Sequence, residues 1–187
     1  SLKQAKAINA IISNETFSSL EYNKKLLFGG LKRFIYISSI GVNGKNNIEP
    51  FSHESDARPT DWYAISKYEA ELALLELAQG TGLEVVIIRP PLVYGPSSPG
   101  NFAKLLTLGI GGFPLPLGAI TNRRSFVSVD NLVDLIISCI NHPKAANQTF
   151  LVSDDQDVST TELLRNIEKA FGKNLLLLPV PVSFLRF

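Results

Sequence analysis

The hydrophobic and polar positions of the chain fall into short apolar runs that predict strands and longer stretches with a helical period. Residues 33–38 and 84–89 are compact runs of β-branched and aromatic residues, and each predicts a buried strand. The second run is apolar at consecutive positions, which is typical of a parallel strand covered on both faces. Pro90 and Pro91 end it. Shorter strands are expected at 126–129, 148–152 and 175–178.

Helical periodicity and capping residues place helices between these strands. The longest helix is expected to begin at Thr60 or Asp61, to run to about Ala78 and to stop at Gly80 or Gly82. Strands that alternate with helices predict an α/β protein with a mostly parallel sheet. Further helices are expected at 1–12, 19–28, 101–108, 130–141 with Asp130 as N-cap, and 159–171 with a Ser159–Glu162 capping box and Gly172 as its stop.

Composition and charge exclude several classes of function. With 187 residues, 45% hydrophobic and 19% charged, the chain is expected to form one globular domain or one and a half. A net charge of +1 gives no reason to expect nucleic acid or an anionic membrane as partner. No apolar run approaches the roughly 20 residues of a membrane span, and the N-terminus does not resemble a signal peptide. A cytoplasmic protein is therefore expected.

The cysteine and histidine residues offer little chemistry. Cys139 is the single cysteine and lies in an apolar run, so we expect it to be buried as a small hydrophobic residue. His53 and His142 fall in separate polar loops without a cysteine nearby. The sequence therefore predicts no metal site.

One component of a dinucleotide-binding sheet is missing from the sequence. Such a sheet needs a glycine-rich turn after its first strand, where the pyrophosphate meets a helix N-terminus. No G-x-G-x-x-G pattern follows a predicted strand, and the nearest run, 109–112, is followed by Phe113 and Pro114 rather than by a helix. The expectation is a fragment, or a protein that lacks its cofactor-binding half.

Candidate chemistry begins with Tyr63 and Lys67, which lie four residues apart on one face of the longest predicted helix. A phenol beside an ammonium is a proton-transfer pair, because the cation stabilises the phenolate and lowers the tyrosine pKa. The pair alone favours an ordinary surface contact, because most tyrosine–lysine pairs at this spacing do nothing chemical. Ser38 and Ser39 end the first predicted strand, at the edge of the sheet where parallel α/β proteins bind their ligands.

Four ordered motifs together resemble the extended short-chain dehydrogenase/reductase family over roughly residues 31–178. Within that family the likeness is greatest to NAD-dependent nucleotide-sugar epimerases of the UDP-glucose 4-epimerase type. Four motifs at suitable spacing are far more specific than the tyrosine–lysine pair. They are I-S-S-I-G-V-N-G at 37–44, Y-x-x-x-K at 63–67, R-P-P-L-V-Y-G-P at 89–96 and R-S-F-V-S-V-D-N-L at 124–132.

The resemblance implies a catalytic set of Ser39, Tyr63 and Lys67. Tyr63 as phenolate would take the proton of a sugar hydroxyl while hydride leaves for the nicotinamide. Lys67 would hold the tyrosine pKa down and bind the nicotinamide ribose, and Ser39 would hydrogen-bond the reacting oxygen. The implied cofactor is NAD, with NADP not distinguished from it. Its implied contacts are Ser38, Tyr63, Lys67, Pro90 and Pro91.

The resemblance also implies a UDP-sugar substrate and the residues that bind it. Arg124 matches a diphosphate-binding arginine, a task that suits a guanidinium. Leu92 stands where galactose-type epimerases have an asparagine, so that contact departs from the family pattern. Ordinary loop packing remains an alternative for the others. The implied substrate contacts are Ser39, Leu92, Asn101, Leu115, Pro116, Leu117 and Arg124.

The fold implied by the resemblance is a partial Rossmann-like parallel sheet with a small interleaved substrate-binding region. The Rossmann-like part is expected at 1–97 and 123–153, and the substrate-binding region at 98–122 and 154–187. A homodimer is implied for a full-length protein.

The activity implied is NAD-dependent epimerisation at C4 of a UDP-sugar through a keto intermediate. A sugar 4,6-dehydratase is disfavoured, because Ile40 and Gly41 occupy the positions of its acid pair. Two alternatives stay open. One is an NAD(P)-dependent keto-sugar reductase or hydroxysteroid-type dehydrogenase, and the other is a non-catalytic remnant or binding module.

Overall fold

The computed structural model describes residues 30–47, 49–95, 107, 113–172 and 174–184. The chain divides into two compact units, the first made of Ser1–Pro91 and Asn131–Val152 and the second of Leu92–Asp130 and Ser153–Phe187. The helices expected at 1–12, 19–28 and 101–108 lie outside the described residues, except for Thr107, which is helical. The division into Rossmann-like and substrate-binding regions expected from the sequence stays a prediction.

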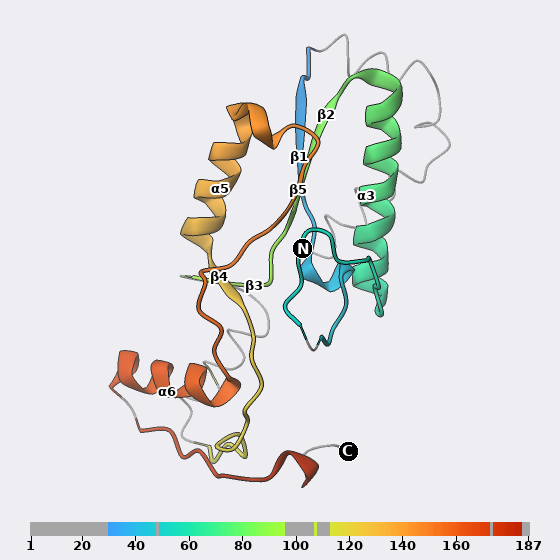
Figure 1. Ribbon diagram of the computed structural model, residues 1–187. Helices are drawn as coiled ribbons and strands as arrows, with labels where there is room; N and C mark the ends of the chain where they lie inside the picture. The colour runs from blue at the N-terminus through green and yellow to red at the C-terminus, as the bar shows by residue number, and fades with distance from the viewer. Residues whose placement is uncertain (1–29, 48, 96–106, 108–112, 173, 185–187) are drawn as a thin grey trace. The chain divides into compact units, whose positions relative to one another are not determined.

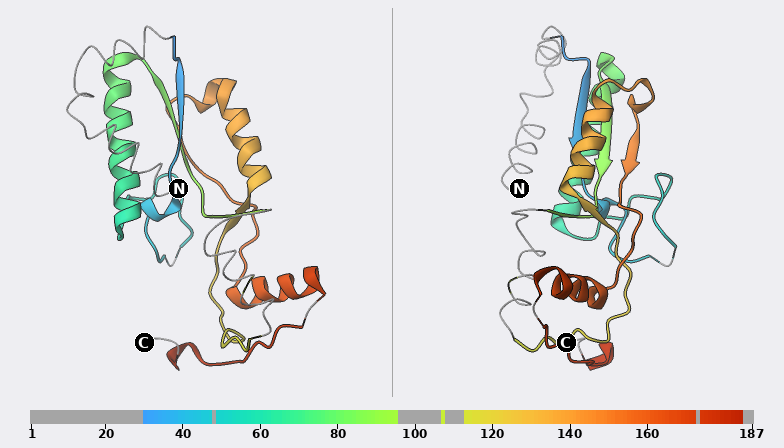
Figure 2. Two further views of the ribbon diagram at one scale, coloured as in Figure 1. Left: turned by 180° about the vertical axis from the view of Figure 1, so that it is seen from behind. Right: turned by 90° about the vertical axis from the view of Figure 1, so that its left-hand side faces the viewer.

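The first unit contains a three-stranded parallel sheet in the order β1-β2-β5. Its strands are β1 (Arg33–Ile37), β2 (Glu84–Arg89) and β5 (Thr149–Leu151), and Figure 2 shows them side by side. The central strand β2 is buried from its second residue to its last, which confirms that it is covered on both faces. The predicted α/β class with a parallel sheet is confirmed.

Two helices cover the opposite faces of this sheet, α3 (Trp62–Thr81) and α5 (Val129–Asn141) (Figure 1). On one face, Ala70 and Leu74 of α3 pack with Tyr36 of β1 in a hydrophobic cluster that includes residues of β2. The helix begins after Asp61, whose carboxylate accepts a hydrogen bond from the Ala64 backbone N–H at 2.9 Å. Its C-cap is Gly82 in a left-handed conformation, which confirms one of the two predicted stops, and its last residue is Thr81 rather than Ala78.

On the other face, Arg33 of β1 binds the C-terminal end of α5. Its Nη1 donates to the carbonyls of Cys139 at 2.6 Å, Ile140 at 3.0 Å and His142 at 3.0 Å. The same guanidinium pairs with Glu84 at the start of β2, at 2.7 Å. Cys139 is buried, as predicted. A cation at a helix C-terminus is stabilising because the last carbonyls carry partial negative charge.

One predicted helix boundary was wrong. Asp130 was expected to be the N-cap of α5, but the helix begins at Val129 and Asp130 lies in its first turn. The reason is the direct passage from strand to helix: β4 (Phe126–Ser128) ends one residue before α5 begins, so no loop is left to supply a cap.

The second unit contains a two-stranded parallel sheet, in which β3 (Leu92–Tyr94) pairs with β4. Its helix α6 (Thr160–Phe171) begins with the predicted capping box of Ser159 and Glu162 and ends at Gly172 in a left-handed conformation. The core contains Leu115, Leu164 and Ile167. The described residues also contain three short 3-10 helices: η2 (Ile40–Val42), η3 (Pro143–Ala145) and η4 (Val182–Phe184).

The strand predicted at 175–178 was also wrong. This segment forms only an isolated bridge between Leu115 and Leu177, with backbone hydrogen bonds on either side of it. Its partner segment contains Pro114 and Pro116, which have no N–H to continue a ladder. Among the helices in the described ranges, none has the length and apolar character needed to cross a membrane.

Candidate active site

The candidate site lies at the carboxyl ends of β1 and β2 in the first unit. The chain leaves β1 at Ile37, and the backbone N–H of Ser38 donates to the carbonyl of Ile88 at 2.7 Å. The N–H of Ile40 then donates to the carbonyl of Pro90 at 3.0 Å. These bonds fix Ser38 and Ser39 beside the end of β2, as the position of ligand sites in parallel sheets predicts.

Helix α3 brings Lys67 to the same edge of the sheet. Its Nζ donates to the carbonyl of Ile37 at 2.9 Å and lies 4.9 Å from the centre of the Tyr36 ring and 5.8 Å from the centre of the Tyr63 ring. Tyr63 and Lys67 therefore share one face of α3, as the spacing predicts, and Tyr63 is 43% exposed. The phenol is open to a ligand, whereas the ammonium is held against the strand.

Ser39 approaches α3 through the short helix that it caps. Its Oγ accepts a hydrogen bond from the N–H of Gly41 at 3.1 Å. A Cβ atom added to Gly41 would lie 3.4 Å from the Cβ of Ala64 and 3.4 Å from Ser39 Oγ. η2 and the first turn of α3 are thus in contact beside Ser39 and Tyr63. Across the residues with described positions, no hydrogen bond joins the two side chains to each other.

The pKa of Tyr63 is raised from its usual value. Burial raises the pKa of this phenol, and the negative charge of Asp61 adds to the effect. The lowering of this pKa by Lys67 stays a prediction. Burial also lowers the pKa of the Lys67 ammonium, and the charge of Glu71 opposes that change. The ammonium donates to Ile37 and not to the phenol oxygen, so it does not stabilise the phenolate directly.

A buried polar cluster beside this pair was not expected from the sequence. The guanidinium of Arg89 binds both carboxylate oxygens of Glu71, with Nε to Oε1 at 3.0 Å and Nη2 to Oε2 at 2.6 Å. Its Nη1 donates to Asn43 Oδ1 at 3.1 Å. The available signal was the position of Glu71, one helical turn after Lys67 on the same face.

The implied cofactor contacts are also at this edge. Ser38 is 3% exposed, and its Oγ has no hydrogen-bond partner among the residues whose positions are described. Pro90 is buried and Pro91 is half-buried. A buried hydroxyl without a partner is uncommon, so Ser38 keeps one donor and one acceptor for a bound molecule.

The implied substrate contacts belong to the second unit, apart from Ser39. Leu92 begins β3 and is half-buried, and Pro116 is exposed. Leu115 packs in the core with Leu164, as the alternative of ordinary packing predicts. Asn101 lies outside the described residues.

Leu117 and Arg124 are held in the second unit by backbone contacts that do not involve their side chains. The carbonyl of Leu117 accepts from Thr161 Oγ1 at 2.6 Å. The backbone of Arg124 forms an antiparallel bridge to Val158, while its side chain is exposed. Arg124 can therefore offer its guanidinium to an anion. The substrate roles of all these residues stay predictions.

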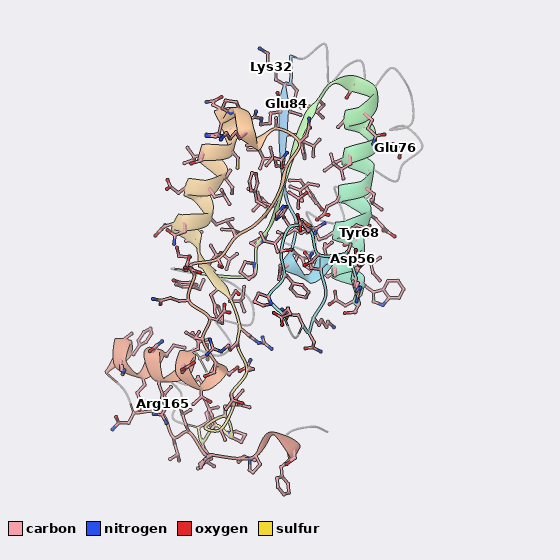
Figure 3. The ribbon with its side chains drawn as sticks, viewed as in Figure 1. Lys32, Asp56, Tyr68, Glu76, Glu84 and Arg165 are labelled. Carbon is pink, nitrogen blue, oxygen red and sulfur yellow. The ribbon has the colours of Figure 1, made fainter. Side chains whose placement is uncertain are left out.

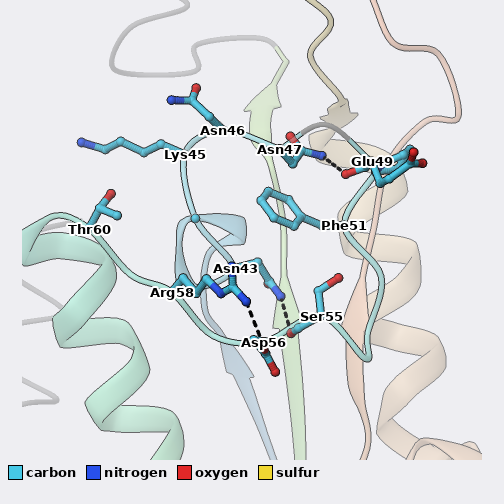
Figure 4. A pocket seen from close by; sticks show the side chains of 12 residues that line it. Asn43, Lys45, Asn46, Asn47, Glu49, Phe51, Ser55, Asp56, Arg58 and Thr60 are labelled. Carbon is cyan, nitrogen blue, oxygen red and sulfur yellow. Dashed lines mark hydrogen bonds and ion pairs between the residues drawn. The ribbon is translucent and has the colours of Figure 1, made fainter.

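A pocket of about 820 Å³ lies in the loop that joins η2 to α3 (Figure 4). Twelve residues between Asn43 and Thr60 line it. Two ion pairs lie at this pocket, Arg58 with Asp56 at 3.1 Å and Lys45 with Asp61 at 3.3 Å. Neither Ser39, Tyr63 nor Lys67 is among the lining residues, so this pocket is separate from the candidate catalytic groups.

Comparison with known proteins identifies the family. The family model described as "NAD dependent epimerase/dehydratase family" matches residues 5–153. The chain is 49% identical over 183 residues to a UDP-glucose 4-epimerase of Vibrio cholerae, covering 96% of this chain and 56% of that protein. It is 31% identical over 161 residues to the N-acetyl-alpha-D-glucosaminyl-diphospho-ditrans,octacis-undecaprenol 4-epimerase of Escherichia coli O157:H7, covering 83% of this chain and 48% of that protein.

A solved structure shares the fold. The crystal structure of UDP-glucuronic acid 4-epimerase from Bacillus cereus in complex with NAD superimposes with a TM-score of 0.75 at 20% identity, covering 83% of this chain and 52% of that one. The chain spans about half the length of the curated relatives it matches. The family match over most of the chain and the 49% identity agree, and the chain belongs to the NAD dependent epimerase/dehydratase family.

Proposed function

We propose that the full-length protein catalyses NAD-dependent epimerisation at C4 of a UDP-sugar through a keto intermediate. The observation that carries the proposal is the convergence of Tyr63, Lys67 and the Ser39 segment at the carboxyl ends of β1 and β2. The two relatives named above add support, because both are 4-epimerases.

The proposed chemistry assigns Tyr63 the proton transfer. As the phenolate, this half-exposed side chain takes the proton of the C4 hydroxyl, and the resulting phenol returns it to the C4 oxygen when the keto carbon is reduced on its other face. Lys67 supplies a fixed positive charge within 5.8 Å of that ring, which favours the phenolate once the site is closed to water. Ser39 donates its hydroxyl hydrogen to the reacting oxygen, because its Oγ only accepts a hydrogen bond, from Gly41.

The residues present fit the nicotinamide end of the cofactor. Ser38 Oγ is buried without a partner among the described residues, and the Lys67 ammonium, bonded to Ile37, keeps two further N–H groups to donate. When bound, NAD accepts the C4 hydride and gives it back. The chain itself carries no glycine-rich turn for the pyrophosphate, so the proposal concerns the full-length protein. Whether that protein is a homodimer stays a prediction that light scattering will test.

The test is an assay of the full-length protein with UDP-glucose, UDP-galactose and their N-acetylated forms, followed by NMR of the product sugar. Epimerisation without added reduced cofactor is expected. The variant Y63F is expected to lose activity by roughly 10²–10⁴-fold, as for removal of a general acid–base group. Y68F, on the same helix, is the matched control (Figure 3). Turnover that requires external NAD(P)H would indicate a reductase instead, and full activity of Y63F would exclude Tyr63 as the base.

A further inference from the structure

The Glu71–Arg89–Asn43 cluster, hereafter the buried cluster, joins three parts of the candidate site. Glu71 is 1% exposed, Asn43 2% and Arg89 8%, so these polar groups are removed from water. Arg89 is the last residue of β2, Glu71 lies on α3 and Asn43 directly follows η2. Burial of an ion pair at this depth brings little net stability, which leaves room for another role.

The buried cluster also fixes the segment that begins with Ser39. Asn43 is the C-cap of η2 and its backbone N–H donates to the carbonyls of Gly41 and Ile40. Its side-chain amide donates to the carbonyl of Ser55 at 3.1 Å and accepts from Arg89 at 3.1 Å. Both polar atoms of the Asn43 amide are therefore used, and the distance between η2 and α3 is set through Arg89 and Glu71.

The charges around Lys67 make Glu71 important to it. Among the residues that the structure describes, the groups beside Lys67 are the rings of Tyr36 and Tyr63 and the carboxylate of Glu71, which pairs with Arg89 of β2. Glu71 is the carboxylate in this set. Burial lowers the pKa of the Lys67 ammonium, and the charge of Glu71 opposes this. The proposed proton transfer needs Lys67 in its charged form, which the Glu71 carboxylate favours.

We propose that Glu71 is a positioning residue for the Tyr63–Lys67 pair: bound by Arg89, which Asn43 binds in turn, its carboxylate places a negative charge one helical turn from Lys67 and fixes α3 against η2. This inference rests on the proposed function, since it assigns Glu71 a role in that proton transfer. Glu71 does not touch the substrate and acts only through Lys67 and the placement of α3.

The test measures the ionisation of Lys67 itself. Competitive acetylation of the full-length protein over a range of pH, read by peptide mass spectrometry, gives the pKa of Lys67 without any turnover. The variant E71Q is expected to lower this pKa, because burial is then no longer opposed by a carboxylate. E76Q is the matched control, since Glu76 is an exposed glutamate on the same helix (Figure 3), and it is expected to leave the pKa unchanged.

A second variant separates this role from a purely structural one. E71M/R89M removes both buried charges, so neither is left unpaired, and it is expected to fold even if E71Q does not. Loss of the Glu71 carboxylate lowers the pKa of Lys67, and loss of the more distant Arg89 cation partly offsets this, so the pKa is expected to fall less in the double variant than in E71Q. An unchanged Lys67 pKa in folded E71Q, or a Lys67 pKa in the double variant at or above the wild-type value, would overturn the inference.

Kinetics then report on the proton transfer. E71Q is expected to lower kcat by about tenfold or more at alkaline pH with little change in KM, and to move the alkaline limb of the pH profile to lower pH. Failure of the proposed function is recognised separately, because a wild-type protein without epimerase activity would still give a Lys67 pKa. An E71Q enzyme with a wild-type pH profile would contradict the role in catalysis.

Discussion

Replacing Arg33 with methionine is expected to lower the free energy of unfolding by about 2 kcal/mol. The guanidinium donates to the carbonyls of Cys139, Ile140 and His142 at the end of α5 and pairs with Glu84. Methionine keeps most of the aliphatic stem, so the loss reports the polar contacts rather than a cavity.

The magnitude comes mainly from one of these contacts. The bond to the Cys139 carbonyl is partly buried, and a bond from a charged donor contributes about 1.5–3 kcal/mol. The bonds to Ile140 and His142 are exposed, and water replaces them. The Glu84 side chain is 41% exposed, so that pair contributes less than about 1 kcal/mol. The positive charge at the helix C-terminus adds about 0.3–1 kcal/mol.

Urea denaturation followed by circular dichroism measures the effect, with the m value checked for constancy. K32M is the matched control, because Lys32 is the exposed neighbour of Arg33 (Figure 3) and its replacement is expected to change stability by less than about 0.5 kcal/mol. Equal unfolding midpoints for R33M and K32M would refute the reasoning.

Three further predictions concern single side chains. S38A is expected to leave the free energy of unfolding unchanged or slightly higher, because the Ser38 hydroxyl lacks a partner among the described residues. The same variant is expected to bind NAD about fivefold more weakly in calorimetry. G118A is expected to destabilise the second unit by about 1–3 kcal/mol in urea, because the new Cβ would lie 2.9 Å from the carbonyl carbon of Leu178; wild-type stability would refute this contact. Burial raises the pKa of Tyr36 from 10.0 to about 12, so its contribution to stability is complete below pH 10 and is lost as the pH rises through 12. Y36F is expected to remove this pH dependence, and an unchanged alkaline stability curve would contradict it.

The elements with strong local signals could be predicted from the sequence. The bounds of β2 match the apolar run at 84–89, because consecutive apolar residues between a glycine and two prolines leave few alternatives. The capping box of α6 and the N-cap Asp61 are local hydrogen-bonding patterns as well. For the same reason, the helical spacing placed Tyr63 and Lys67 on one face.

What depended on distant partners could not be predicted. β3 has only three residues and exists because it pairs with β4, more than thirty residues later. At 175–178 the apolar residues predict a strand, but the partner segment is interrupted by prolines and only one bridge forms. The Arg89–Glu71 pair joins residues 18 positions apart, and no local pattern couples a strand terminus to a helix interior.

The partner of the Lys67 ammonium was likewise not local. Its spacing from Tyr63 indicated a charge that lowers the phenol pKa, but the ammonium donates to the carbonyl of Ile37, 30 positions earlier. A rotatable four-carbon stem reaches several acceptors, and packing decides between them.

The first unit is built from two separate stretches of chain, which leave it at Pro91 and rejoin it at Asn131. Arg33 and its acceptor at Cys139 are 106 positions apart, and the backbone of Val85 donates to the Asn147 side chain across 62 positions. High contact order slows folding, since loop-closure entropy is lost before such contacts form. During synthesis, β1 and β2 leave the ribosome before α5 and β5, so the edge of β2 that pairs with β5 and the sheet face that α5 covers stay open to aggregation until the later stretch arrives.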